Sequence, residues 1–296
     1  MSSILKNNVQ STNQLINGRD SSIDVAKGIG IFLVVWGHQF ANCPIHDWII
    51  LFHMPLFFII GGCFIKDEAY KVFLYKKMRT LLIPFIVFYL FSFIVKTGLY
   101  YIRSHSFDFL FDLHFYSTKT INYVLWFIMC LFIAINIYYF VRKMGRFKLP
   151  MILFLVTISA FLFYYQISLP LWTSQAMMVV GFLYLGETYY KRGTSDKLLL
   201  VLFLLTAPLW WYVGAQHFKT DMGGLTIPAN FLYFIIPALS GTALTLLLGR
   251  LISLYRWAGI FRMMGTYSLF IFGFHVNTGF LDGICHLTLS FTPPVR

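Results

Sequence analysis

Residues 23–42, IDVAKGIGIFLVVWGHQFAN, decide the fold: they form an apolar run of membrane-spanning length that still carries Asp24, Lys27 and His38. An α-helix turns by about 100° per residue, so Lys27 and His38 return to within about 20° of the same helix face. At about 1.5 Å per residue, they lie roughly 16 Å apart along the axis. Ionisable side chains inside a membrane segment indicate a functional site. This polar column therefore reaches from near one membrane surface deep into the segment.

The composition of the whole chain is that of a membrane protein. Hydrophobic residues make up 58% of the 296 residues and charged residues 11%, and the mean hydropathy is +0.72. A soluble globular domain is far more polar. Apolar runs near the length needed to cross about 30 Å of hydrocarbon predict an all-α, polytopic helical bundle. About nine transmembrane helices are expected, at residues 23–42, 47–65, 80–101, 121–141, 149–167, 171–190, 198–214, 228–249 and 265–288.

The net charge of +12 predicts the orientation of this bundle. With a cytoplasmic N-terminus, eighteen of the 23 Lys and Arg residues fall on the inner side, and the other five fall on the outer side. Membrane proteins carry such an excess of basic residues in their cytoplasmic loops. We therefore expect a multi-pass protein of the cell (inner or plasma) membrane that contacts membrane lipids and has no nucleic-acid partner.

The chain is expected to form one membrane domain preceded by a short tail. Residues 1–20 are polar and lack the apolar core of a cleavable signal peptide, which predicts a cytoplasmic tail and insertion directed by the first helix. Residues 21–296 contain no internal repeat or linker that would divide them. The four cysteines show no metal-ligand spacing, and we expect no metal.

Three histidines are the candidate catalytic residues. His53 enters its helix from the outer side and lies roughly 9 Å below that surface, at a depth similar to that of His38. His275, in the ninth predicted helix, lies near the predicted midplane of the membrane. His38 and His53, at one level on adjacent antiparallel helices, could meet across a shared cavity, where burial and a partner would tune their pKa values for proton transfer. For His53, the alternative is a bond to a backbone carbonyl that Pro55 leaves without its helical donor.

Basic residues before the third predicted helix are candidates for binding an anion. Lys76, Lys77 and Arg79 could hold the phosphates of a nucleotide-containing cofactor. Arg79, nearest to the apolar helix, is the stronger candidate, and a topology signal with lipid-headgroup contact explains the lysines equally well. Trp126, in the outer part of the fourth predicted helix, either lines a cavity or belongs to the interfacial aromatic belt.

Five motifs, taken in order, resemble the acyltransferase 3 family of integral-membrane acyltransferases, particularly members similar to fucose 4-O-acetylases. They are IDVAKGIGIFLVVWGH (23–38), FHMPLFFIIGG (52–62), KKMRTLLIPF (76–85), LWFI (125–128) and MGTYSLFIFGFH (264–275). The resemblance covers residues 19 to 280 and implies nine to ten membrane helices. Lys27 stands where arginine is common in the family, and Gly61 where serine is frequent.

This resemblance implies transfer of an acyl group, usually acetyl, from cytoplasmic acetyl-CoA to a hydroxyl of an extracytoplasmic sugar or glycan. His38 would act as general base, and His53 or His275 would supply a second hydrogen bond or proton path. The expected acetyl-CoA-binding residues are Lys27, Arg79, Lys76, Lys77 and Trp126. Direct transfer and an acyl-histidine intermediate both stay open. So do the acyl chain length and the acceptor, whether a free sugar, a lipid-linked repeat unit, a cell-envelope polysaccharide or an antibiotic glycoside.

Two other classes of protein also stay open. A secondary transporter or lipid-linked glycan flippase would use the intramembrane His, Lys and Asp residues as a proton relay. The chain shows neither an inverted repeat nor a matching pair of broken helices, which many transporters have. A non-enzymatic membrane scaffold would tolerate the replacement of His38.

Overall fold

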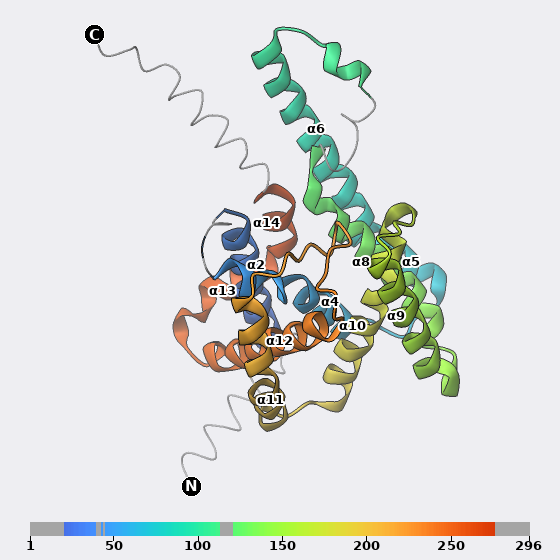
Figure 1. Cartoon of the computed structure of the whole chain (residues 1–296), viewed down its shortest axis with the longest axis vertical. Helices are drawn as coiled ribbons and strands as arrows, with labels where there is room; N and C mark the ends of the chain where they lie inside the picture. The colour runs from blue at the N-terminus through green and yellow to red at the C-terminus, as the bar shows by residue number, and fades with distance from the viewer. Residues whose placement is uncertain (1–20, 40–42, 44, 113–120, 276–296) are drawn as a thin grey trace, which may run out of the picture.

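The computed structural model describes residues 21–39, 43, 45–112 and 121–275, which form helices joined by short loops (Figure 1). These residues contain no β-strand, and Asp221 and Thr226 form an isolated bridge. The predicted all-α fold is therefore confirmed for the described part of the chain. The predicted tail, residues 1–20, and the predicted ninth helix beyond residue 275 lie outside the described residues.

Twelve α-helices run through the described residues, and a π-helical turn, Met78–Leu82, joins two of them. The α-helices are α2 (Ser21–Gln39), α3 (His46–Ile50), α4 (His53–Cys63), α5 (Tyr70–Lys77), α6 (Ile83–Ser104), α8 (Trp126–Val141), α9 (Lys148–Tyr164), α10 (Thr173–Arg192), α11 (Asp196–Ala215), α12 (Leu232–Ser253), α13 (Gly259–Thr266) and α14 (Ser268–Phe274).

Six helical stretches of the described residues are long and apolar enough to cross a membrane, which supports a multi-pass membrane protein. They are His46–Cys63, Tyr70–Ile102, Tyr123–Val141, Gly145–Tyr164, Asp196–Ala215 and Leu232–Ser253. The expected total of nine and the cytoplasmic position of the N-terminus stay predictions.

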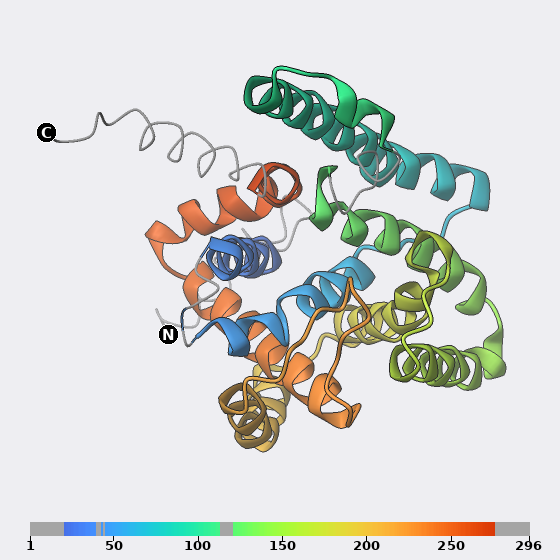
Figure 2. The same ribbon diagram turned by 45° about the horizontal axis from the view of Figure 1, so that its top comes forward.

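The outer helices of the bundle present apolar side chains to their surroundings. Only 11% of the Tyr70–Ile102 window and 17% of the Asp196–Ala215 window are buried inside the protein. Figure 2 shows α6 and α11 at opposite edges of the bundle. Apolar surfaces this large are unusual on a water-soluble monomer, and lipid is the solvent that suits them.

Helix α2, which carries Lys27 and His38, is enclosed by other helices: it packs against α12, α13, α14 and α4 (Figures 1 and 2). Its contact with α13 depends on glycine. A Cβ atom added to Gly28 would lie 1.9 Å from the carbonyl oxygen of Phe261, and one added to Gly265 would lie 1.8 Å from that of Asp24. Small residues let membrane helices approach this closely, because van der Waals packing replaces the hydrophobic driving force. The position of α2 is therefore tightly defined.

Helices α4, α8 and α10 pack against one another and share the largest cluster of buried apolar side chains. Phe58 of α4 is fully buried there and contacts Trp126 and Phe127 of α8, with ring centroids 6.3 and 4.7 Å apart. Because interior side chains are packed at crystal-like density, this cluster fixes α8 relative to α4. The start of α8 and the start of α4 both belong to the site described below.

A buried carboxylate ties α8, α9 and α10 together at the end of the bundle where Arg142 lies. Glu187 of α10 accepts hydrogen bonds from Arg142 (2.7 Å), Lys148 (3.2 Å) and Tyr138, and Lys191 lies 2.7 Å away. The Glu187 side chain is 4% exposed and that of Arg142 is 6% exposed. Burying a charge is costly unless it is paired and hydrogen-bonded, and this set of partners meets that condition.

Candidate active site

Histidines from three separate helical segments meet at one place in the bundle. His38 lies near the end of α2, His53 begins α4, and His275 directly follows α14. The ring centroid of His38 is 6.2 Å from that of His53 and 5.0 Å from that of His275. The structure thus brings together the three residues proposed from the sequence as catalytic. Their catalytic role stays a prediction.

A break between α3 and α4 orients the His53 ring. Helix α3 ends at Ile50 and α4 starts at His53, so the Ile49 carbonyl accepts the Phe52 backbone N–H at 3.1 Å and His53 Nδ1–H at 3.1 Å. Pro55 lacks the N–H that would bond to Leu51 in a continuous helix. His53 therefore does bond to a backbone carbonyl, as the alternative interpretation had it, although the carbonyl is that of Ile49. The same ring also lines a cavity.

His275 is oriented in the same way, because its Nδ1 donates to the Phe272 carbonyl at 2.8 Å. In a neutral imidazole, a protonated Nδ1 makes Nε2 the acceptor nitrogen. His53 and His275 are 6% and 5% exposed, whereas His38 is exposed. Of the three rings, His38 is therefore the most accessible to a substrate.

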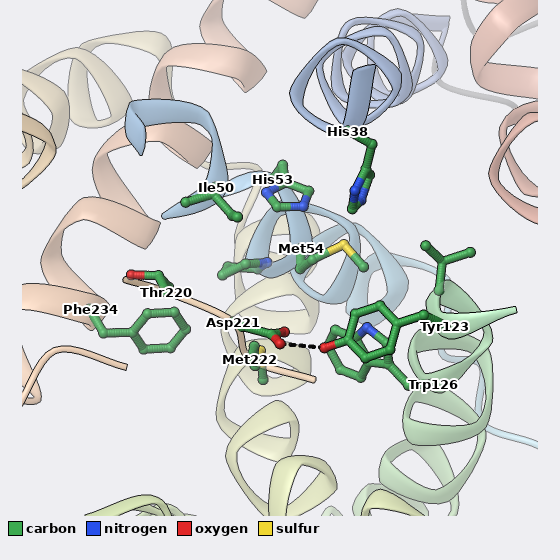
Figure 3. Close-up of a pocket in the computed structure, with 12 residues that line it drawn as sticks. His38, Ile50, His53, Met54, Tyr123, Trp126, Thr220, Asp221, Met222 and Phe234 are labelled. Carbon is green, nitrogen blue, oxygen red and sulfur yellow. Dashed lines mark hydrogen bonds between the residues drawn. The ribbon is translucent and has the colours of Figure 1, made fainter. Parts of the chain in front are cut away.

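His38 and His53 face a cavity with about 450 Å³ of space not filled by protein atoms, part of it open to solvent (Figure 3). Its lining residues come from α2, the α3–α4 region, the start of α8, the loop between α11 and α12, and α12 itself. They are His38, Ile50, His53, Met54, Pro55, Tyr123, Val124, Trp126, Thr220, Asp221, Met222 and Phe234. We call this space the histidine cavity.

A carboxylate lies on the other side of the histidine cavity from the imidazoles. Tyr123 donates its hydroxyl hydrogen to Asp221 Oδ2, and Figure 3 shows this pair opposite His38 and His53. The sequence reasoning did not single out Tyr123 or Asp221. The available signal was the segment TDMGGLT (220–226), an aspartate followed by two glycines between two long apolar helices.

The loop that carries Asp221 is fastened by side-chain amides. The buried Gln175 donates from Nε2 to the Gly223 carbonyl at 2.9 Å, and Gln166 donates to the Leu225 carbonyl at 2.8 Å. A Cβ atom added to Gly223 would lie 2.7 Å from Trp126 Nε1, so this close approach requires glycine. The loop therefore lies directly against the start of α8.

A second cavity, which we call the lysine cavity, lies beside the Lys27 end of α2. It has about 650 Å³ of unfilled space, part of it open, and apart from Lys27 and Ser268 its lining is apolar. Lys27 Nζ lies 2.6 Å from Asp24 Oδ1 and 5.4 Å from the centre of the Phe64 ring. The remaining lining residues are Ile31, Phe57, Ile60, Gly61, Phe64, Leu81, Phe127, Leu131, Leu269 and Phe272.

The two cavities share no lining residue. Phe57, Phe127 and Phe272 line the lysine cavity, and the centroid of Phe127 lies 6.2 Å from that of Phe57 and 5.0 Å from that of Phe272. Phe272 in turn lies 5.6 Å from the His275 ring, centroid to centroid. Phe272 therefore lies between the lysine cavity, which it lines, and the buried His275 ring.

The other predicted acetyl-CoA-binding residues line neither the lysine cavity nor, apart from Trp126, the histidine cavity. Lys76 Nζ lies 2.7 Å from both carboxylate oxygens of Glu68, and Lys77 Nζ lies 5.6 Å from the centre of the Phe73 ring. Arg79 is exposed. Trp126 lines the histidine cavity, whereas Lys27 lines the lysine cavity. Their binding of acetyl-CoA stays a prediction.

The described residues contain no group of three or more His, Cys, Asp or Glu side chains that could hold a metal ion.

A comparison with protein families matches residues 20–288 to the acyltransferase domain of the acyltransferase 3 family. No curated protein and no solved structure matches the chain. The family match includes every residue that lines the histidine cavity or the lysine cavity.

Proposed function

Because the chain belongs to the acyltransferase 3 family, we propose that it transfers an acetyl group from acetyl-CoA to a hydroxyl of a sugar or glycan, with His38 as general base. The family match makes the chain an acyltransferase. The donor, the acceptor and the role of His38 are our proposal. It rests chiefly on one observation: an exposed His38 is backed by two buried, oriented imidazoles at the wall of a cavity.

His38 would take the proton from the acceptor hydroxyl as its oxygen attacks the thioester carbonyl. The new ester C–O bond forms, the C–S bond breaks, and the CoA thiolate takes up the proton that His38 received. A general base of this kind contributes about 10²- to 10⁴-fold in rate. A sugar hydroxyl is a weak nucleophile at its ordinary pKa, so the reaction depends on this proton transfer. His53 and His275 would hold the His38 ring in position.

The lysine cavity suits the acyl and pantetheine end of acetyl-CoA. Its apolar lining accommodates a chain of methylene groups, and Lys27 and Ser268 provide polar contacts. The phosphates would stay outside, near the exposed Arg79 and the neighbouring Lys76 and Lys77. The thioester would reach His38 when the Phe57, Phe127 and Phe272 side chains move aside.

We propose a cytoplasmic opening for the lysine cavity and an extracytoplasmic opening for the histidine cavity, in the cell membrane. The positive-inside distribution of Lys and Arg supports this orientation. Helix α2 then carries Lys27 near the cytoplasm and His38 near the outer side. Donor and acceptor approach His38 from opposite sides.

Acetyl transfer in membranes that contain the protein tests this proposal. Radiolabelled acetyl-CoA and a panel of glycans are supplied to wild type, His38→Ala and the control His105→Asn. His105 is exposed beyond α6 with a φ of 50°, a conformation that asparagine tolerates. We expect label in glycan with wild type and control, and a loss of about 100-fold or more with His38→Ala.

Equal labelling by His38→Ala would contradict the base assignment. Glycan movement across the membrane that does not depend on acetyl-CoA would indicate a transporter instead. Acetyl-CoA binding to the purified protein, measured calorimetrically, separates these outcomes, because a flippase has no need of the coenzyme.

A further inference from the structure

The Tyr123–Asp221 pair offers hydrogen-bond acceptors in the part of the histidine cavity that faces His38 and His53. Asp221 is exposed, and a carboxylate has about four lone-pair positions, of which the Tyr123 hydroxyl uses one. The hydroxyl also holds the carboxylate in one orientation. Asp221 can therefore accept hydrogen bonds from the hydroxyl groups of a ligand.

Aromatic surface lies next to this carboxylate. Trp126 lines the same cavity, is 4% exposed, and is held by Phe58 at a ring-centroid distance of 6.3 Å. A pocket that combines apolar and aromatic surface with a few fixed polar groups is the usual form of a small-molecule site. A sugar ring matches this combination, because its C–H faces are apolar and its rim carries hydroxyls.

The position of Asp221 is fixed before any ligand arrives. Its backbone N–H and carbonyl both pair with Thr226, at 2.7 and 2.8 Å, and Gln175 and Gln166 fasten the turn between them. Gln175 is 1% exposed, so a buried amide is committed to holding this loop. A binding group that is ordered in advance loses little conformational entropy when the ligand binds.

Charge narrows the class of ligand. Among the twelve residues that line the histidine cavity, Asp221 is the one with a fixed charge, since the other ionisable groups there are the histidines and Tyr123. A carboxylate on the ligand would face the Asp221 carboxylate, and like charges placed together are a strong means of rejecting a wrong partner. A neutral sugar is therefore favoured over an acidic one.

We propose that Tyr123, Asp221 and Trp126 form an acceptor-recognition site that binds a neutral sugar ring through its hydroxyls and excludes sugars that carry a carboxylate. This inference rests on the proposed function, because it places the ring where one hydroxyl points toward His38. The histidine cavity is partly open to solvent, so the rest of a glycan would extend outward from the bound ring.

The direct test is a pair of ligands that differ only at one position. Methyl glucoside and methyl glucuronide have the same ring hydroxyls. They differ at C6, which is part of a hydroxymethyl group in the first and of a carboxylate in the second. Their binding to the purified protein in lipid nanodiscs is measured by saturation-transfer NMR for wild type, Asp221→Asn, Tyr123→Phe and the control Asp108→Asn. Asp108 is an exposed carboxylate outside both cavities.

We expect wild type and Asp108→Asn to bind the glucoside at least 10-fold more tightly than the glucuronide. Asp221→Asn is expected to reduce this preference about 10-fold, because it removes the repulsion. Tyr123→Phe removes only one hydroxyl and weakens glucoside binding several-fold. A wild type that prefers the glucuronide, or a preference that Asp221→Asn leaves unchanged, would overturn the proposal.

Activity separates this site from the chemistry at His38. For any neutral glycan that is acetylated, Tyr123→Phe and Asp221→Asn should raise the KM for the glycan while leaving the KM for acetyl-CoA within about 2-fold. A fall in kcat with an unchanged glycan KM would assign the pair to proton transfer and refute the recognition role. Glucoside binding by a wild type that never uses acetyl-CoA would support the sugar site and reject acetyl-CoA as the donor. His38→Ala should keep the binding preference and lose transfer.

Discussion

The imidazole rings of His38 and His275 lie with their centroids 5.0 Å apart, although the two residues come from opposite ends of the described chain. The two rings differ in their surroundings. His38 is exposed in a cavity, whereas His275 is 5% exposed and donates to the Phe272 carbonyl. A buried ring that is anchored to the backbone can orient a neighbour whose own ring is open to substrate.

Replacing His275 should therefore slow the reaction less than replacing His38. We expect His275→Asn to lower kcat about 10- to 100-fold, because the His38 ring loses a packing partner but keeps its proton-accepting nitrogen. Acetyl-CoA binding should stay unchanged. Steady-state kinetics of both variants check this, and a His275→Asn defect equal to or larger than that of His38→Ala would identify His275 as the base.

Lys27 is expected to act on the donor and on stability at once. Lys27→Met removes a partner at 2.6 Å from Asp24, whose side chain is 4% exposed, and should cost about 3 kcal/mol of stability, because a carboxylate stays buried. It should also raise the KM for acetyl-CoA about 10-fold. The double variant Asp24→Asn/Lys27→Met separates the two effects: stability should recover while the KM stays high. A KM that recovers with stability would mean that Lys27 only neutralises Asp24.

The burial of Glu187 predicts that its replacement costs much more folding stability than the replacement of Glu68, a carboxylate at the same end of the bundle. Glu187→Gln removes the buried carboxylate that pairs with Arg142 and Lys148 and leaves Arg142 only the exposed Asp67, 3.9 Å away. It should cost about 3 kcal/mol, since the arginine side chain is 6% exposed. Glu68→Gln breaks a more exposed pair with Lys76 and should cost less than about 1 kcal/mol. Thermal unfolding in detergent measures both, and equal losses would contradict the role assigned to burial.

Two glycines provide a matched test of close helix packing. Gly28→Ala would place a Cβ atom 1.9 Å from the Phe261 carbonyl oxygen, so we expect α2 and α13 to move apart at a cost of about 1–3 kcal/mol. Gly98→Ala in α6 meets nothing within 4 Å and should be neutral or slightly stabilising, because alanine favours the helix. Melting temperature and acetyl transfer should both fall for Gly28→Ala, whose helix carries Lys27 and His38. Equal melting temperatures would show that the contact adapts easily.

The sequence predicted the all-α class and placed His38 and His53 at one depth, because both follow from hydropathy and helical rise. Depth alone does not say which helices are neighbours. The contact between His38 and His275 arises because α14 follows α13, which packs against α2 through Gly28 and Gly265. Trp126 is a similar case: its depth was readable, but the cavity that it lines depends on how α8 meets α4.

The positions of Asp221 and Glu187 could not be predicted from the sequence pattern. An aspartate in a loop usually points into solvent, and only the Tyr123 hydroxyl and the anchored turn give Asp221 its place in the cavity. Glu187, four residues before Lys191, has the spacing of an ordinary surface pair on a helix. Its burial comes from Arg142, which approaches from another helix. The positions of both side chains are set by tertiary contacts between segments distant along the chain.

In the proposed mechanism, the side chains of Phe57, Phe127 and Phe272, which line the lysine cavity, also affect whether the protein conducts ions across the membrane. A water-filled passage joining the two sides would conduct protons and discharge the membrane potential, which amounts to about 2.3 kcal/mol for each charge at 100 mV. Phenylalanine rings have no titratable group, so they cannot pass protons from one side to the other. In the proposed mechanism, these side chains would therefore keep the protein electrically insulating until donor and acceptor are both bound.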